Sequence, residues 1–330
     1  MKKFLSIALA LLMVCVMLPV VALAAEKTAL TYEELKSAIS TANDGDTIKL
    51  LADIDLSQTI TVNKTITLNM NGKKLYNTSD LWDKPTAEAN NWSLISVRGS
   101  GNLTITGNGT FAAKENDCYA VDVQESATVT IKNGTFIGNI HAVYVFAGTA
   151  NVEGGTYSVQ QKYPDSAKGD EFVLNCYDAN RANGTARINV TGGTFKNFNP
   201  ADNKAEGEGN NFADNSLVVQ KNNTVQNNDY YVGNAANEVI AAASKGEEIF
   251  VLNGTTLTNV PAGVIIQNRT GDRITVNGKD VELTGDAGYT VPASNITIIV
   301  PGDTTPAETP KTEDQKNPST GANDFVGLAA

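Results

Sequence analysis

The 330-residue chain has little of the chemistry that metal and cofactor sites need. It contains one histidine, His141, and three cysteines. A site with two histidine ligands is therefore excluded, and the absence of a Cys-x-x-Cys pair argues against a thiolate zinc site. Only Cys118 and Cys176 lie beyond the first 25 residues, so the chain is not a disulfide scaffold. We expect no cofactor.

Charged and aromatic residues are also scarce. They make up 18% and 7% of the chain, whereas 28 residues are glycine. This balance disfavours charged helical bundles and suits many short strands joined by tight turns. The net charge is −11, and loss of Lys2 and Lys3 with the first 25 residues leaves 23 basic against 36 acidic residues, a charge of −13. Because phosphate backbones repel such a chain, we expect no nucleic-acid partner.

The N-terminus has a secretory pattern. Two lysines precede an apolar stretch and the small-residue end Ala22-Leu23-Ala24, which predicts a cleaved signal peptide over residues 1–25. A Thr-x-x-Glu capping box follows at Thr31 to Glu34, with apolar residues at helical spacing after it. We therefore predict a secreted, extracellular protein whose mature part begins with a short amphipathic helix.

A repeat of strand, glycine, threonine and aromatic residue dominates the next part. Its glycines are 25, 21 and 38 residues apart, and its aromatic residues are Phe111, Phe136, Tyr157 and Phe195. A further strand precedes each motif, at Leu94 to Val97, Ala120 to Val123, Ala142 to Val145 and Val173 to Cys176. Such units predict an all-β fold, a right-handed parallel β-helix with three strands in each coil and coils about 4.8 Å apart.

The same patterns divide the chain. We predict the β-helix over residues 26–215, with the Thr31 helix capping its N-terminal end, because an uncapped end would expose strand edges and core. A smaller β-rich module with one short helix is predicted over residues 216–300, opened by a hairpin of residues 217–220 with 230–232. A Pro/Thr-rich linker spans residues 301–316, and residues 317–330 end the chain.

Residues near the C-terminus carry a family resemblance. They read Asn317, Pro318, Ser319, Thr320, Gly321. With the secretory start, the Asn-Gly-Lys-Lys-Leu and Gly-Gly-Thr-Phe coils and the linker, this NPxTG motif resembles Gram-positive cell-wall-anchored surface proteins that have a pectin-lyase-like β-helix. The resemblance covers nearly the whole chain.

This resemblance implies an anchoring route. NPxTG is similar to the LPxTG-type signal, which a sortase cuts between threonine and glycine, here Thr320 and Gly321, before joining the threonine to peptidoglycan. Sortase and peptidoglycan are therefore the expected partners. Asn317 replaces the leucine of the family motif, and the membrane helix and basic tail of the family do not follow it. We therefore expect a truncated sorting signal, and an accidental occurrence of the motif is the alternative.

Aligned strands predict two outward columns of side chains on the β-helix. The first contains Ser96, Asp122, Tyr144 and Asn175, and the second Arg98, Gln124, Phe146 and Tyr177, while Val97, Val123, Val145 and Cys176 point inward. Aromatic rings beside amide, carboxylate and guanidinium groups suit a sugar. The candidate ligand-binding residues are Ser96, Arg98, Asp122, Tyr144, Phe146, Asn175 and Tyr177. Inserted loops packed on this face are the alternative.

Catalytic and calcium sites have weaker support. β-Helix lyases and hydrolases use clustered carboxylates, whereas Asp122 is the one acid in the aligned columns and Asp117 and Glu125 lie at turns. These three are weak candidates, and we assign no catalytic residue. The acidic loop with Asp202, Glu206, Glu208 and Asp214 lacks a defined calcium-ligand spacing, so a solvated loop is favoured over a calcium site.

Two remaining polar features are assigned to structure. His141 has no acid partner in the sequence and is predicted to lie at the surface in a turn. Cys118 and Cys176 are predicted to be too far apart for a bridge and to remain thiols.

These patterns favour an adhesin-like surface protein that binds a ligand or displays an attached module. Carbohydrate or host glycoprotein is the expected ligand, and no catalytic step is required. A polysaccharide lyase or glycoside hydrolase and a structural wall spacer are the alternatives.

Overall fold

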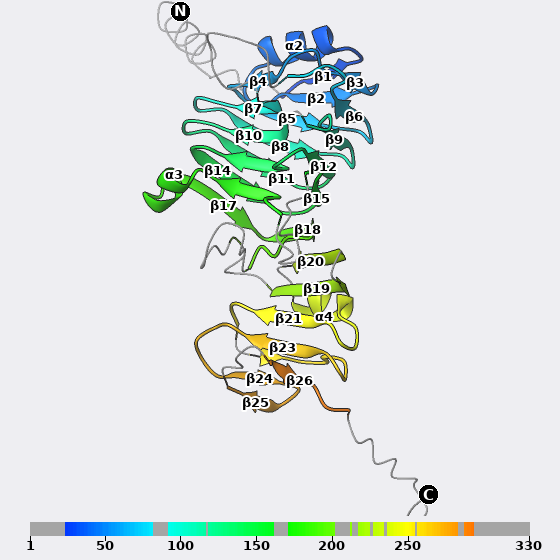
Figure 1. Ribbon diagram of the computed structural model, residues 1–330. Coiled ribbons are helices and arrows are strands. Elements are labelled where there is room, and N and C mark those ends of the chain that lie inside the picture. The colour runs from blue at the N-terminus through cyan, green and yellow to red at the C-terminus, as the bar shows by residue number, and fades with distance from the viewer. Residues whose placement is uncertain are drawn as a thin grey trace, which may run out of the picture. The chain divides into compact units, whose positions relative to one another are not determined.

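The computed structural model consists mostly of strands, with few helices (Figure 1). The structure describes residues 24–81, 92–116, 118–161, 171–201, 212, 217–224, 227–233, 236–254, 256–282 and 287–293. The predicted signal peptide, apart from its last two residues, lies outside this part of the chain. So do the four acids of the acidic loop, the linker and the NPxTG motif.

Three of the four sheets contain long series of parallel strands. Sheet A contains β1 (Glu26–Ala29), β2 (Thr47–Leu50), β5 (Thr65–Asn69), β8 (Asn102–Thr106), β11 (Thr128–Ile131), β14 (Gly148–Val152) and β17 (Ala186–Val190). Sheet C contains β4 (Ile60–Val62), β7 (Ser93–Val97), β10 (Tyr119–Val123), β13 (Val143–Val145) and β16 (Leu174–Cys176). In sheet B the parallel strands are β3 (Ile54–Asp55), β6 (Lys74–Tyr76), β9 (Thr110–Ala112), β12 (Thr135–Gly138), β15 (Thr156–Val159) and β18 (Gly192–Lys196).

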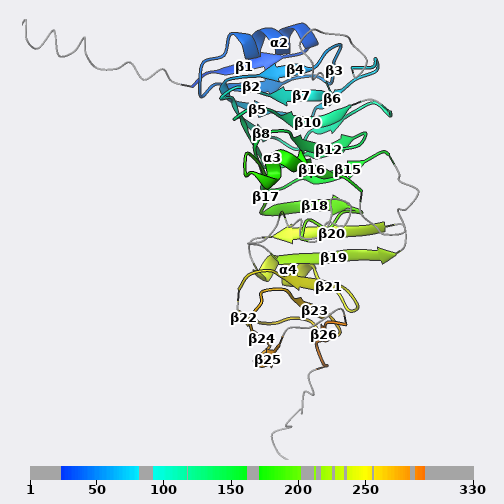
Figure 2. The same ribbon diagram turned by 60° about the vertical axis from the view of Figure 1, so that its left-hand side comes forward.

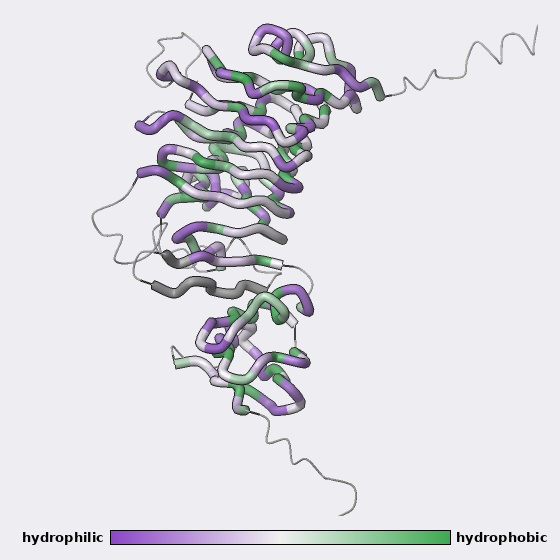
Figure 3. The backbone as a smooth tube through the Cα atoms, turned by 90° about the vertical axis from the view of Figure 1, so that its right-hand side faces the viewer, coloured by the Kyte–Doolittle hydropathy of each residue, from purple (hydrophilic) through white to green (hydrophobic). Residues whose placement is uncertain are grey.

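The chain visits these sheets in turn. From β5 to β18 each strand pairs in parallel with the third strand after it, so β5 pairs with β8, β6 with β9 and β7 with β10. Along strands such as β5 and β8 hydrophobic side chains alternate with polar ones, and Figure 3 shows hydrophobic (green) and hydrophilic (purple) segments alternating along the tube. This stacked arrangement of parallel strands is compatible with a β-helix.

The Gly-Thr-aromatic motif forms a column of rings inside the stack. Phe111, Phe136, Tyr157 and Phe195 are fully buried on successive strands of sheet B, with ring centroids 4.8, 5.1 and 5.0 Å apart. The glycines that precede the last three rings, Gly134, Gly155 and Gly193, leave room for ring atoms. Gly155 has φ +104°, and a Cβ there would lie 3.0 Å from the Gly134 carbonyl oxygen and 3.1 Å from the Tyr157 hydroxyl. Stacked rings at this distance stabilise a core beyond their buried area.

Helix α2 (Tyr32–Ser40) forms where the capping box predicted a helix. The Thr31 hydroxyl accepts a hydrogen bond from the Glu34 N–H at 3.2 Å, and the Glu34 carboxylate accepts one from the Leu30 N–H at 2.8 Å. The face of the helix that carries Leu35 and Ile39 is buried. After the helix the Asp46 carboxylate accepts backbone hydrogen bonds from Ala25 and Asn43, both at 2.9 Å, and these donors lower its pKa.

Sheet B continues into the C-terminal part of the described chain through antiparallel strands (Figure 2). The predicted hairpin is present as β19 (Leu217–Thr224) and β20 (Asn227–Gly233), with Gln220 opposite Tyr230. β20 also pairs with β18, and β19 pairs with β21. The later elements are α4 (Ala236–Ala242), β21 (Glu248–Val251), β22 (Thr256–Leu257), β23 (Ile265–Asn268), β24 (Ile274–Val276), β25 (Lys279–Val281) and β26 (Tyr289–Thr290).

Parallel pairing resumes after the hairpin, and with it a local unit seen at the N-terminus. β21 pairs in parallel with β23, as β2 does with β5. Gly246 and Glu247 follow α4 as Gly45 and Asp46 follow α2, both glycines have positive φ, and the Glu247 carboxylate accepts the Ser244 N–H at 2.7 Å. The unit of helix, turn and first parallel strand therefore occurs twice. β26 and β25 then pair antiparallel with β23 and β24.

Candidate binding surface on sheet C

The two columns predicted from the sequence have the expected register. Asp122 pairs with Ser96 on one side and with Tyr144 on the other, and Tyr144 pairs with Asn175. Their neighbours Val97, Val123, Val145 and Cys176 also pair with one another and are buried inside the stack. The second column consists of the residues that follow the four strand ends: Arg98, Gln124, Phe146 and Tyr177.

Solvent reaches these columns unevenly. Ser96 and Asp122 are 0% and 1% exposed, so they lie on the outer side of β7 and β10 but do not meet solvent. Tyr144 and Asn175 are partly exposed, and Phe146 and Tyr177 are 39% and 44% exposed. The most exposed side chains of the two columns therefore follow β13 and β16, and on the first two strands Arg98 is the column residue that is partly exposed.

A buried polar network joins the first two strands. The Asp122 carboxylate accepts hydrogen bonds from the Ser96 hydroxyl at 3.0 Å and from Gln124 Nε2 at 2.7 and 2.9 Å. The Ser96 hydroxyl oxygen in turn accepts one from Arg98 Nε at 2.9 Å. Burial raises the pKa of Asp122 from 3.8 to about 6, and the two hydrogen-bond partners and the Arg98 charge reduce this rise.

His141 is buried, so the prediction that it lies at the surface is wrong. It is 6% exposed, and its Nδ1 lies 2.7 Å from the Phe172 carbonyl oxygen, which can only accept a hydrogen bond. Asn175 Nδ2 donates to Nε2 at 3.3 Å, so the ring is the neutral Nδ1–H tautomer. Burial lowers its pKa from 6.5 to about 4. The chain that returns after residue 171 covers the ring, and the turn sequence around His141 gives no sign of that cover.

Three further aromatic contacts surround this histidine. The Tyr144 ring stacks on His141 with centroids 5.3 Å apart, and Tyr119 lies 4.8 Å from His141 and 5.2 Å from Tyr144. Burial, followed by the Asp122 charge, raises the pKa of Tyr144 to about 12. Tyr119 was not among the predicted site residues, because strand alternation gives it the inward parity of Val121 and Val123, and only the structure shows its ring beside His141 and Tyr144.

Phe146 and Tyr177 form an exposed stacked pair, called here the aromatic pair. Their ring centroids are 4.8 Å apart and their planes differ by 23°. The Tyr177 N–H donates to the Val145 carbonyl oxygen at 2.9 Å, and Asn180 on helix α3 (Asp178–Ala182) donates to the Phe146 carbonyl oxygen at 2.6 Å. Because β16 ends sheet C, no further strand of this sheet stacks on Tyr177.

Of the three weak catalytic candidates, the structure describes Asp122 and Glu125, and it does not bring these two into contact. Asp117 lies outside the described residues. Glu125 is exposed at a turn with φ +62°, and its carboxylate accepts the Gly99 N–H at 2.7 Å. Within the described ranges, no hydrogen bond or ion pair links Glu125 to Asp122, and no three His, Cys, Asp or Glu side chains are placed to hold a metal ion.

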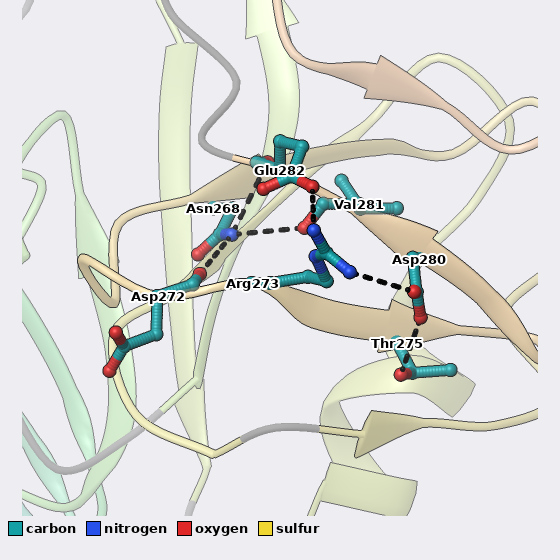
Figure 4. A network of polar contacts seen from close by, with 7 residues as sticks. All are labelled: Asn268, Asp272, Arg273, Thr275, Asp280, Val281 and Glu282. Carbon is teal, nitrogen blue, oxygen red and sulfur yellow. Dashed lines mark hydrogen bonds and ion pairs between the residues drawn. The ribbon is translucent and has the colours of Figure 1, made fainter.

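Another polar cluster lies in the C-terminal part and has a structural role (Figure 4). Arg273 lies 2.7 Å from the Glu282 carboxylate and 3.3 Å from that of Asp280. Asn268 Nδ2 donates to the carbonyl oxygens of Asp272, Val281 and Glu282 at 2.8, 3.4 and 3.3 Å. These contacts fasten the β24–β25 hairpin to the end of β23, and the three charged side chains are mostly exposed.

Cys118 and Cys176 are buried thiols, as predicted. None of the helices in the described ranges is long and apolar enough to cross a membrane. Comparison of the chain with protein-family models, with curated proteins and with solved structures gave no match.

Proposed function

We propose that the chain is a secreted surface protein, anchored to a Gram-positive cell wall through its linker and NPxTG motif, that binds carbohydrate or host glycoprotein in the manner of an adhesin. Its stack is a right-handed parallel β-helix with three strands in each coil over residues 26–215, which α2 caps at the N-terminal end, and residues 216–300 form a smaller β-rich module. The signal-peptide pattern and the motif support secretion and anchoring. The parallel pairing of every third strand supports the fold.

The aromatic pair is the observation that carries the binding proposal. Exposing a pair of large aromatic side chains to water is unfavourable, yet Phe146 and Tyr177 are 39% and 44% exposed. Backbone hydrogen bonds hold both residues at the ends of their strands. The C–H face of a pyranose packs on such rings, and neighbouring hydroxyl and amide groups bond its hydroxyls. Tyr144 supplies a hydroxyl on β13, beside Asn175 on β16, whose Nδ2 donates to His141. Several weak contacts along a wall-bound chain add up through avidity.

The test is binding of the purified protein to an immobilised glycan array. We expect Phe146→Ala and Tyr177→Ala each to weaken the strongest signals at least tenfold, because each removes one ring of the platform. Tyr76→Ala is the matched control, since Tyr76 is a partly exposed ring on the outer face of sheet B, beneath the Lys74 ammonium. Equal binding by all three variants would overturn the proposal.

The alternative from the sequence is a polysaccharide lyase or glycoside hydrolase. The pKa of Asp122 is raised to about 6, but this carboxyl is 1% exposed and so does not reach a substrate as a general acid or base must. Mass spectrometry of the supernatant separates the two functions. Released unsaturated or hydrolysed sugars would establish the enzyme, whereas binding without release supports the adhesin. Neither binding nor release would favour the structural wall spacer.

A further inference from the structure

The buried network ends beside the aromatic pair. Val123 pairs with Val145, so Gln124 and Phe146 occupy neighbouring positions in the second column. Gln124 is 7% exposed, and its Nε2 donates to both oxygens of the Asp122 carboxylate. The carboxylate thus fixes the side chain that lies next to the exposed rings.

We infer that the Asp122 carboxylate holds Gln124, and through it the aromatic pair, in the ligand-binding arrangement, and that protonation of this carboxyl weakens glycan binding. The inference rests on the proposed function and adds its regulation. Asp122 is a positioning residue in this scheme, because at 1% exposure it does not itself meet a ligand.

In the described part of the chain, few charged or polar groups lie next to the Asp122 carboxylate. From β7 it faces the Ser96 hydroxyl and the Arg98 charge, from the end of its own strand Gln124, and from β13 Tyr144. Tyr144 stays neutral because its pKa is raised to about 12. His141, behind Tyr144, also stays neutral in this range because burial lowers its pKa to about 4. Among these described groups, Asp122 is therefore the one that changes charge between pH 5 and pH 7.5.

Protonation changes the hydrogen-bond count around Asp122. The ionised carboxylate accepts all three hydrogen bonds, whereas the acid has a hydroxyl that must itself donate. The Ser96 oxygen already accepts from Arg98, which directs the Ser96 proton to Asp122. Gln124 Nε2, with two bonds to the carboxylate, is the donor that loses a partner. Its amide then turns or moves away from the carboxyl.

The first experiment measures affinity at two pH values. Cellohexaose, xylohexaose and chitohexaose serve as probes, titrated into the purified protein at pH 7.5 and at pH 5.0. With a pKa of about 6, about one tenth of Asp122 is ionised at pH 5.0, so the apparent Kd is expected to rise about tenfold there. Asp122→Asn should bind weakly and equally at both values. His141→Gln, which removes the buried histidine behind Tyr144, should keep the tenfold change.

The second experiment reads the switch without a ligand. The side-chain amide resonance of Gln124 should shift with pH, with a midpoint near 6 in the wild type and in His141→Gln, and stay constant in Asp122→Asn. A constant resonance in the wild type, or a pH-dependent affinity retained in Asp122→Asn, would overturn the inference. A titrating resonance with no binding of any probe would instead refute carbohydrate binding while confirming that Asp122 controls Gln124.

Discussion

Asp122 and His141 have opposite effects on the pH dependence of stability, and separating them is the sharpest test of the burial of this face. The pKa of Asp122 is raised from 3.8 to about 6 in the folded protein, so the folded state binds its proton more readily than the unfolded state. Stability from this group therefore falls as pH rises from about 4 to 6. At 1.36 kcal/mol for each pH unit of pKa difference, the loss is about 3 kcal/mol.

His141 acts in the other direction over the same range. Its pKa is lowered from 6.5 to about 4, so the unfolded state binds the proton more readily. Stability from this group therefore rises as pH increases from 4 to 6.5, again by about 3 kcal/mol. The two contributions nearly cancel in the wild type, and removing either one exposes the other.

The assay is urea unfolding at pH 4, 5, 6 and 7, with each variant compared with the wild type at the same pH so that the other titrating groups cancel. From pH 4 to pH 7, Asp122→Asn should gain about 3 kcal/mol relative to the wild type, and His141→Gln should lose about 3 kcal/mol. Thr67→Ser on sheet A is the control, because it removes no ionisable group, so its difference from the wild type should stay nearly constant. The reasoning would be refuted if the free energy of unfolding changed with pH by the same amount in all four proteins.

Three other results are expected. Phe136→Ala should lower the free energy of unfolding by about 3 to 5 kcal/mol, because it removes a fully buried ring from the column in sheet B. Phe146→Ala at the surface should lower it by about 1 kcal/mol or less. Chemical denaturation measures both losses, and equal losses would contradict the assigned burial. Asp46→Asn should reduce the fall in melting temperature between pH 5 and pH 2.5. Backbone donors lower the pKa of Asp46, so the stabilisation from this carboxylate is lost as it is protonated below its unfolded pKa of 3.8. A fall equal to that of the wild type would show that these donors do not favour the charged form. The thiols of Cys118 and Cys176 should react with a thiol reagent only after denaturant is added, and rapid reaction in the native protein would contradict their burial.

Local sequence signals account for the features of the fold that depend on neighbouring residues. The capping box at Thr31 locates α2 because its side chains bond the first backbone N–H groups of that helix. The strand register follows from the period of two, since inward and outward residues must match from coil to coil. The Gly-Thr-aromatic motif adds an independent marker on sheet B, where Phe136 pairs with Phe111 and Tyr157.

Features that depend on contacts between residues far apart in the sequence could not be predicted from these local signals. Ser96 and Asp122 point outward as predicted, but their burial depends on what lies over the outer face of β7 and β10, and alternation carries no information about that. The same holds for His141, which is covered by chain some thirty residues later. The antiparallel pairing of β18 with β20 joins segments on either side of the acidic loop, and neither strand sequence specifies the other.

The strand order also predicts how the stack responds to mechanical force. In sheet A each strand from β5 onward is bonded only to the strand one coil before it and the strand one coil after it, and β1 and β17 are the two ends of the series. A pull between these ends acts along the hydrogen bonds, so it loads the few bonds of one coil at a time. Coils should therefore open one after another at low force. From β5 to β17 each opened coil would add between 21 and 38 residues of extended chain, so the proposed adhesin would lengthen under load before it detached.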